Sequence, residues 1–323
     1  MSLSLARVVD AVLEGTVAGS FSRLGFEARS RLDDWQDPPA DALAGKRILL
    51  TGATSGIGKA AAGRLLDLGA EVHLVGRDEQ KSIKAEAELT VAHPNGKAAS
   101  HLADLSLLAD ADALAQGLLD AGEPLDAVVH NAGALLAEKT VTAEGVETTL
   151  AVHLLSPHLL TARLAPLLRP TARVLWMTSG GMYSQGLDVE HLEMPADGYK
   201  GATQYARAKR AQIELLPHWA DALAPTAVAH ALHPGWADTP GVEQGLPGFR
   251  KVTRPILRTP DQGADTLVWL LWADEPLTSS GDLWLDRRRR STTRLPGTGT
   301  HDGERARLLQ WVEEAIDRTG VTP

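Results

Sequence analysis

The sequence predicts a doubly wound α/β fold, with a parallel sheet of about seven strands in a single domain that carries an N-terminal helical extension. Short apolar runs recur along the chain, and a segment of helical period separates each run from the next. A glycine-rich turn also follows the first run and opens a helical segment. Repeated strand-then-helix units place helices on both faces of a parallel sheet, which indicates the doubly wound class.

The predicted strands are short and apolar, as expected for strands buried on both faces of a sheet. They are 47–50, 71–75, 98–103, 126–130, 173–178, 227–232 and 282–285. These strands lie within a core domain that we expect at 46–290. A helical extension with its linker (1–45) precedes this domain, and a tail with a helix (291–323) follows it.

The N-terminal extension contains apolar residues at helical spacing, followed by the polar linker DDWQDPPAD at 33–41. The spaced residues are Leu5, Val8, Val9, Val12, Leu13 and Val17. We expect this amphipathic helix to pack on the body of the protein through its apolar stripe. Peripheral contact of residues 1–30 with a membrane, or docking of a partner, remains the alternative.

Composition and charge exclude several classes of protein. The 323 residues include 41 acidic and 32 basic side chains, so the net charge of −9 disfavours nucleic acid as a partner. The absence of cysteine excludes disulfides and thiolate chemistry, and it suits a reducing cytoplasm. Charged residues interrupt the first 15 positions, and no apolar run reaches the ~18 residues of a membrane span. We therefore expect a soluble, cytoplasmic protein.

The histidines and the basic run suggest no further site. His153 and His158 are five residues apart and point to different faces of a helix, and the other histidines lack the spacing of metal ligands. We expect no metal. The run Arg287 to Arg290 is interpreted as a solvated loop rather than a contact for anions or nucleic acid.

The glycine-rich turn predicts a dinucleotide site. Gly52, Gly56 and Gly58 lie between the end of the first strand and the start of a helix. Glycine at these places lets the chain turn tightly and lets backbone N–H groups approach a pyrophosphate at the positive helix N-terminus.

The spacing G-x-x-x-G-x-G after Thr51 resembles the short-chain dehydrogenase/reductase family. Further motifs follow in that family's order over about 45 to 290, namely Asp104-Leu105, Asn131-Ala132-Gly133, Ser179, Tyr205 with Lys209, and Pro234-Gly235 through Thr239. The resemblance implies a Rossmann-type fold and a nicotinamide-dependent oxidoreductase. The cofactor-binding residues it implies are Gly52, Ser55, Gly56, Ile57, Gly58, Arg77, Asp104, Leu105, Asn131, Ala132, Gly133, Tyr205, Lys209, Pro234, Gly235 and Thr239.

The catalytic residues that the resemblance implies are Ser179, Tyr205 and Lys209. Tyr205 and Lys209 are four residues apart on a predicted helix, so they share one face. A tyrosine, with a reference pKa of about 10, needs a nearby cation to exchange protons near neutrality. Lys209 would supply this charge, and the Ser179 hydroxyl would bond the substrate oxygen.

The end of the second strand favours NADP(H) over NAD(H). Gly76 stands where an acid would select NAD, and Arg77 follows it. A guanidinium fits a 2′-phosphate, the absent side chain of Gly76 would leave it space, and Lys59 would add positive charge. In the alternative, Arg77 is a solvated cation and Asp78 bonds the ribose of NAD.

Two positions depart from the family pattern. Tyr205 follows Ser179 by 26 residues, which predicts an inserted loop within 183–200 near the site. His153 replaces the helix asparagine that helps a water link the lysine to solvent. An imidazole can take over the role of this asparagine, because it also donates and accepts hydrogen bonds. If it does not, the protein would be a cofactor-binding sensor or partner-binding protein with little turnover.

The segments 179–185, 205–212 and 233–249 also resemble one branch of the family, together with the extension and the tail. We expect an NADP(H)-dependent enzyme that interconverts a carbonyl and an alcohol on an apolar small molecule, beneath a lid at about 236–258 that includes Trp236. A sugar-nucleotide epimerase would need G-x-x-G-x-x-G, which the chain lacks. A homodimer through the helices at 143–168 and 201–216 remains open, unless the N-terminal extension covers that surface.

Overall fold

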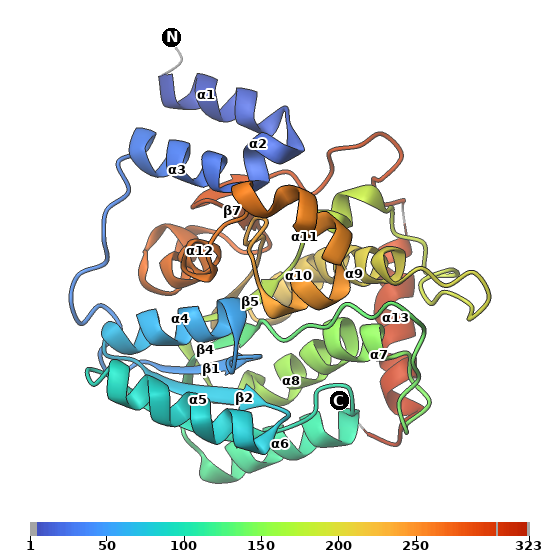
Figure 1. The fold of residues 1–323 in the computed structure, drawn as a ribbon. Helices are drawn as coiled ribbons and strands as arrows, with labels where there is room; N and C mark the ends of the chain where they lie inside the picture. Colours follow the sequence, from blue (N-terminus) through green and yellow to red (C-terminus); the bar gives the residue numbers. More distant parts are fainter. Residues whose placement is uncertain (1–4, 302, 322–323) are drawn as a thin grey trace.

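An eight-stranded sheet forms the centre of the protein in the computed structural model, which describes residues 5–301 and 303–321 (Figure 1). The strand order is β3-β2-β1-β4-β5-β6-β7-β8, and the first seven strands of the chain run parallel. The strands are β1 (Arg47–Thr51), β2 (Glu71–Gly76), β3 (Lys97–Leu102), β4 (Leu125–His130), β5 (Leu168–Met177), β6 (Ala227–Leu232), β7 (Leu283–Leu285) and β8 (Arg288–Arg290). This topology confirms the doubly wound α/β class. The direction of winding reverses between β1 and β4, where such folds bind ligands.

Helices cover both faces of the sheet and divide the apolar core into two layers. One layer holds α4 (Gly56–Asp67), α5 (Glu79–Ala92) and α12 (Pro260–Trp272), and the other holds α6 (Leu108–Ala121), α8 (Ser156–Leu164) and α9 (Gly201–Ala222). A short helix α7 (Thr148–Leu150) and a π-helical turn (Ala151–Leu155) lead into α8. Residues 236–258, the predicted lid, include α10 (Pro240–Gly245) and α11 (Pro247–Thr253).

The basic run at Arg287 to Arg290 is not the solvated loop that the sequence suggested. Asp286 and Arg287 both have φ of +54°, which makes a two-residue turn that pairs β8 antiparallel to β7. The sequence did not predict this hairpin, because the usual Asn-Gly signal for such a turn is missing and because the acidic partners of these arginines are remote in sequence. The ion pairs join Arg287 to Asp265, Arg288 to Asp10 and Asp33, and Arg290 to Asp10.

The N-terminal extension forms α1 (Leu5–Glu14), α2 (Val17–Phe21) and α3 (Arg23–Leu32), which lie across the β7 end of the sheet (Figure 1). Helix α1 packs on the body as expected, but not mainly through its apolar stripe, of which only Val9 and Leu13 are half-buried. Asp10 is buried against the body, whereas Val8 and Val12 are exposed. Ion pairs to arginines of the body determine this orientation.

A C-terminal helix, α13 (Glu304–Asp317), packs on α9 and on the π-helical turn. Leu308, Val312 and Ile316 of α13 are fully buried, and Arg305 donates a 2.9 Å bond to Glu214 of α9. The segment that covers part of the expected dimer surface is therefore the C-terminal helix rather than the N-terminal extension.

Candidate active site

The glycine turn brings three segments into contact at the carboxyl end of β1. Gly52 has φ of +66°, and a Cβ there would lie 2.7 Å from the Cα of Ala132. A Cβ at Gly58 would lie 2.2 Å from the carbonyl oxygen of Gly52. Only glycine therefore lets α4 start this close to the strand ends. Ser55 is the N-cap of α4 and makes no side-chain capping bond, so the first-turn amides, including that of Ile57, can bind a pyrophosphate.

Asn131 ties the ends of β4 and β1 together. Its Nδ2 donates to the carbonyl oxygens of Thr51 at 2.9 Å and Gly52 at 3.2 Å. The Thr51 hydroxyl accepts from the amides of Asn131 and Ala132, each at 3.0 Å. Thr51 thus shapes the site, a role that sequence reasoning left unassigned although the residue directly precedes the glycine turn.

The segment from Pro234 to Thr239 lies over the glycine turn. A Cβ at Gly56 would be 3.4 Å from the Thr239 methyl group, and Thr239 itself caps α10. Gly235 has φ of +76°, and a Cβ there would overlap the Arg258 guanidinium. The structure therefore brings both glycine-containing segments to one edge of the sheet, as their motifs predict.

The residues after β3 are also at this edge. The Asp104 carboxylate accepts from the amide and the hydroxyl of Ser106 at 3.0 and 2.8 Å, which holds the turn after the strand. Leu105 is buried, and its carbonyl accepts a 2.8 Å bond from the Ser156 hydroxyl.

Arg77 is exposed at the end of β2 and has no charged partner in the part of the chain that the structure describes. Asp78, which could bond a ribose, instead caps α5 by accepting from the Lys81 amide at 3.0 Å. The prediction that Gly76 leaves open space is wrong. A Cβ there would lie 2.6 Å from the Ser82 hydroxyl and 2.7 Å from the Thr54 methyl group.

Lys59, the other predicted source of positive charge, forms an ion pair with Glu88 of α5. Its charge is therefore already balanced, and Arg77 is the free cation at this end of β2 among the described residues.

Ser179, Tyr205 and Lys209 come together between the end of β5 and α9. The Ser179 hydroxyl accepts a 3.4 Å bond from the Gly181 amide, and it lies close enough to Tyr205 to lower the pKa of the phenol. The Lys209 ammonium lies 5.6 Å from the centre of the Tyr205 ring and donates a 2.7 Å bond to the carbonyl oxygen of Met177. The helical spacing of Tyr205 and Lys209 thus places both side chains beside the serine.

Burial shifts both titratable groups of this cluster. It raises the pKa of Tyr205, and the nearby Ser179 hydroxyl only partly offsets that effect. Burial also lowers the pKa of Lys209 from 10.5 to about 7. Each charged form is thus disfavoured alone, so a phenolate and an ammonium would stabilise each other here more than they would in water.

His153 lies in the π-helical turn, and its imidazole is perpendicular to the Tyr205 ring, at 5.1 Å between ring centres. Its Nε2 is 2.7 Å from the carbonyl oxygen of Ala134. Burial, and then the Lys209 charge, lower the pKa of His153 well below its usual value, so the ring is neutral. A Cβ at Gly133 would lie 2.7 Å from the imidazole, which explains glycine there.

The backbone carbonyl of His153 accepts a 2.5 Å bond from the side-chain amide of Gln212. Gln212 lies one turn beyond Lys209 on α9 and was not among the predicted site residues. It was overlooked because no motif includes it.

Phe21 extends the site into the N-terminal helices. Its ring centre lies 4.3 Å from that of His233, and a Cβ at Gly180 would be 2.7 Å from its ring. Its carbonyl accepts a 2.7 Å bond from the Trp236 amide. Phe21 thus supports both the turn after Ser179 and the segment after β6. Sequence reasoning missed this contact because the residues are far apart in the chain.

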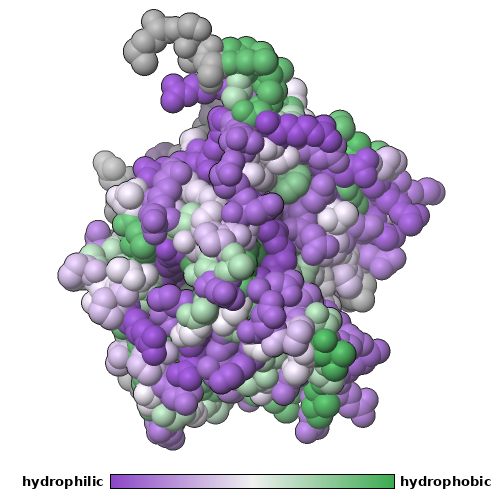
Figure 2. Space-filling model, turned by 90° about the vertical axis from the view of Figure 1, so that its left-hand side faces the viewer, coloured by the Kyte–Doolittle hydropathy of each residue, from purple (hydrophilic) through white to green (hydrophobic). Residues whose placement is uncertain are grey.

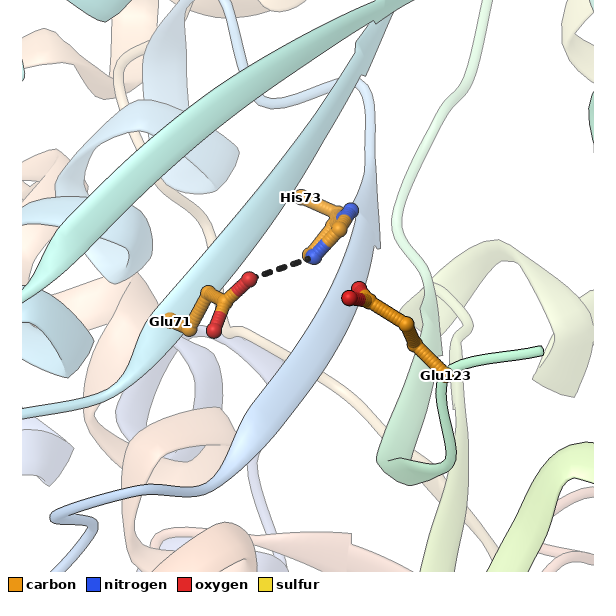
Figure 3. A group of neighbouring side chains, drawn as sticks. All are labelled: Glu71, His73 and Glu123. Carbon is orange, nitrogen blue, oxygen red and sulfur yellow. Dashed lines mark hydrogen bonds and ion pairs between the residues drawn. The ribbon is translucent and has the colours of Figure 1, made fainter. Parts of the chain in front are cut away.

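Glu71, His73 and Glu123 form a cluster of three potential metal ligands (Figure 3). The Arg47 guanidinium lies 3.3 Å from Glu71 and 3.1 Å from Glu123, so it already neutralises both carboxylates. Glu71 starts β2, whereas the residues predicted to bind the cofactor follow the ends of strands, so the cluster is at the opposite edge of the sheet. We assign no metal to it.

Comparison with known proteins identifies the family. A family model described as short chain dehydrogenase matches residues 46–246. The chain belongs to the short-chain dehydrogenase/reductase (SDR) family. It is therefore an NAD(P)-dependent oxidoreductase, as the motifs predicted.

Relatives of this SDR protein match most of its length. Dehydrogenase/reductase SDR family member 12 of Bos taurus is 32% identical over 302 residues, which cover 92% of this chain and 94% of that protein. This match confirms the branch that the C-terminal segments indicated. Polyprenol dehydrogenase of Mus musculus is 28% identical and covers 94% of this chain, with 99% of its own length matched.

The fold is also that of solved SDR structures. A short-chain dehydrogenase from Escherichia coli CFT073, solved with NADPH, aligns with a TM-score of 0.63 at 23% identity, over 78% of this chain and all of that one. This similarity supports the Rossmann-type architecture.

Proposed function

We propose that this SDR protein uses NADP(H) to interconvert a carbonyl and an alcohol on an apolar small molecule. The observation that carries the proposal is the cluster of Ser179, Tyr205 and Lys209 beside the two glycine-containing segments. Within the chain, 46–290 would be the catalytic domain with its lid at about 236–258. Residues 1–45 and 291–323 would be the extension and the tail.

The glycine cradle fits a dinucleotide, because Gly52 and Gly58 let α4 begin close to the strand ends, where its first-turn amides can bind a pyrophosphate. When bound, the nicotinamide would give a hydride to the substrate carbon, or accept one from it. Asp104 and Leu105 would hold the adenine, Asn131 to Gly133 would support the ribose, and Pro234 to Thr239 would cradle the nicotinamide.

The side chains of the cluster would handle the proton. In reduction, the Tyr205 hydroxyl would protonate the developing alkoxide, and in oxidation the phenolate would take that proton back. Lys209 would stabilise the phenolate by its charge, and Ser179 would bond the substrate oxygen and so orient it. His153 would hold the adjacent loop in place through Ala134.

Arg77 supports the preference for NADP(H). It is exposed and without a charged partner among the described residues, whereas Asp78 is engaged in capping α5. A guanidinium at the strand end can bond a 2′-phosphate through two parallel hydrogen bonds.

Aromatic side chains of the lid region support an apolar substrate. Trp236 packs edge-on against Phe249 of α11 with 5.0 Å between ring centres. A relative that covers nearly all of the chain is named a polyprenol dehydrogenase, and polyprenol is an apolar alcohol. Because the chain has no cysteine, we propose the reducing cytoplasm as its location.

NADPH oxidation with a panel of long-chain, steroid-like and aromatic ketones and aldehydes tests this function. The wild-type protein should reduce at least one of them, and Tyr205→Phe should lower turnover at least about 100-fold with NADPH affinity preserved. Tight NADPH binding without reduction of any member would instead favour the sensor.

A further inference from the structure

Helix α1 is attached to the body of the protein by its charged face. Asp10 accepts bonds from Arg29 at 2.7 Å and from Arg290 at 2.8 Å, and Glu14 accepts from Arg29 at 2.8 Å. Burial opposes ionisation of Asp10, but the arginines outweigh it and hold its pKa below the usual range. The orientation of α1 is therefore determined by buried ion pairs.

The opposite face of α1 carries an apolar stripe that faces outward. Leu5, Val8 and Val12 are 70%, 45% and 68% exposed and share one side of the helix, and Val17 and Leu24 of α2 and α3 are 53% and 58% exposed. We call these five residues the outward stripe. Figure 2 shows a hydrophobic patch at the top of the molecule, where the N-terminal helices lie. Single exposed apolar residues are ordinary, but a cluster of this kind marks a contact surface.

Helix α3, which contributes Leu24 to the outward stripe, carries more arginine than carboxylate, although the whole chain carries −9. Arg23 and Arg31 are exposed on α3, and both form ion pairs with Glu27, at 3.4 and 3.8 Å. Asp10 and Glu14, the other carboxylates of 5–32, are turned toward the body, so the two charges of Arg23 and Arg31 exceed the single charge of Glu27. Aliphatic residues flanked by arginines are typical of a helix that lies in the interface of an anionic bilayer.

We propose that the outward stripe docks the protein on the surface of a lipid membrane that contains anionic lipid. The stripe holds only leucine and valine, whereas the centres of protein interfaces are rich in aromatic residues, which favours lipid over a protein partner. None of the described helices has the length and apolar character needed to cross a bilayer, so the contact would be peripheral. The proposal does not depend on the reaction or the cofactor.

Flotation of the full-length protein with lipid vesicles tests the proposal. The vesicles contain phosphatidylcholine alone or phosphatidylcholine with phosphatidylglycerol. The wild-type protein should float with the mixed vesicles and less with the neutral ones. The double variant Val8→Glu/Val12→Glu should reduce the bound fraction at least about tenfold, since it removes two aliphatic contacts and adds two repelled charges.

A matched double variant on another helix provides the control. Ile83→Glu/Val91→Glu changes two exposed aliphatic residues of α5 and should bind vesicles as the wild type does. Circular dichroism should show both variants folded, because all four side chains are exposed. The proposal is overturned if the wild type does not float, or if both variants lose binding equally. It is also overturned if light scattering shows that Val8→Glu/Val12→Glu only disrupts self-association.

Discussion

The imidazole Nε2 of His153 lies 2.7 Å from the carbonyl oxygen of Ala134, so the side chain joins the π-helical turn to the loop after β4. The contacts described for this imidazole are with Ala134 and with the Tyr205 ring. A proton link from His153 to Lys209 therefore stays a prediction, and anchoring of the loop is the role with direct geometric support.

His153→Asn should keep turnover within about tenfold of the wild type, because an amide can still donate to the Ala134 carbonyl. His153→Leu leaves that carbonyl without its bond, which should cost about 1–3 kcal/mol of unfolding free energy and lower turnover. Urea unfolding and steady-state kinetics of both variants measure these effects. Equal stability and turnover of the two variants at several pH values would show that the ring is only a packing element.

Arg77→Ala should weaken NADPH binding by about tenfold to a hundredfold and leave NADH binding nearly unchanged. The reason is that only NADPH carries the 2′-phosphate that the guanidinium would bond. Fluorescence titration with both cofactors measures the ratio. Lys81→Ala, on the neighbouring α5 and exposed, is the matched control and should affect both cofactors little. A native preference for NADH would contradict the assignment of Arg77.

Phe21→Ala should lower turnover at least about tenfold, because the ring supports Gly180 beside Ser179 and packs on His233 and Trp236. Adenosine 2′,5′-bisphosphate, which lacks the nicotinamide, should bind as in the wild type. Phe21→Leu should restore part of the turnover.

This ligand separates positioning from misfolding. Loss of bisphosphate binding together with turnover would mean that the Phe21 variant is simply unfolded or globally perturbed. Unchanged turnover in a folded Phe21→Ala protein would show that the N-terminal extension does not contribute to the active site.

Removal of α13 should change the oligomeric state. The full chain should not dimerise through the α9 surface, because Leu308, Val312 and Ile316 of α13 already cover part of that surface. A chain truncated after Gly299 exposes the apolar partners of these residues and should dimerise or aggregate. Light scattering over a range of concentrations compares the two proteins. A full-length dimer that persists after truncation would show that another surface is used.

Acid should destabilise the protein below about pH 6.5. Burial lowers the pKa of His130 and His233 to about 3 and that of His158 to about 4. Between these values and 6.5 the unfolded chain binds protons that the folded chain does not, so stability falls as pH falls, by about 2 kcal/mol per histidine from pH 6.5 to 5. Urea unfolding at several pH values measures the slope.

His130→Asn should reduce the loss of unfolding free energy between pH 6.5 and 5 by the contribution of one histidine. His191→Asn, at an exposed position, should not alter this loss. An unchanged pH slope in His130→Asn would contradict the assignment.

The features determined by the sequence itself are local ones. The glycine turn requires positive φ at Gly52 and a close approach of Gly58 to Gly52, and the spacing of Tyr205 and Lys209 places them one helical turn apart. Apolar runs of strand length predicted seven parallel strands at nearly their observed positions. Each pattern acts through neighbours in the chain, so it can be interpreted without knowing the fold.

Only the tertiary structure decided which face of α1 points inward and what supports the serine turn. The apolar stripe of α1 predicted inward packing. Instead, Asp10 is buried, where it forms ion pairs with Arg288 and Arg290 from the far end of the chain. A buried charge requires such partners. Likewise, Asp286 accepts bonds from Arg29 and Arg258 in the turn that creates β8, and Phe21 reaches Gly180 across the fold. These contacts join residues remote in sequence, so no local periodicity or motif encodes them.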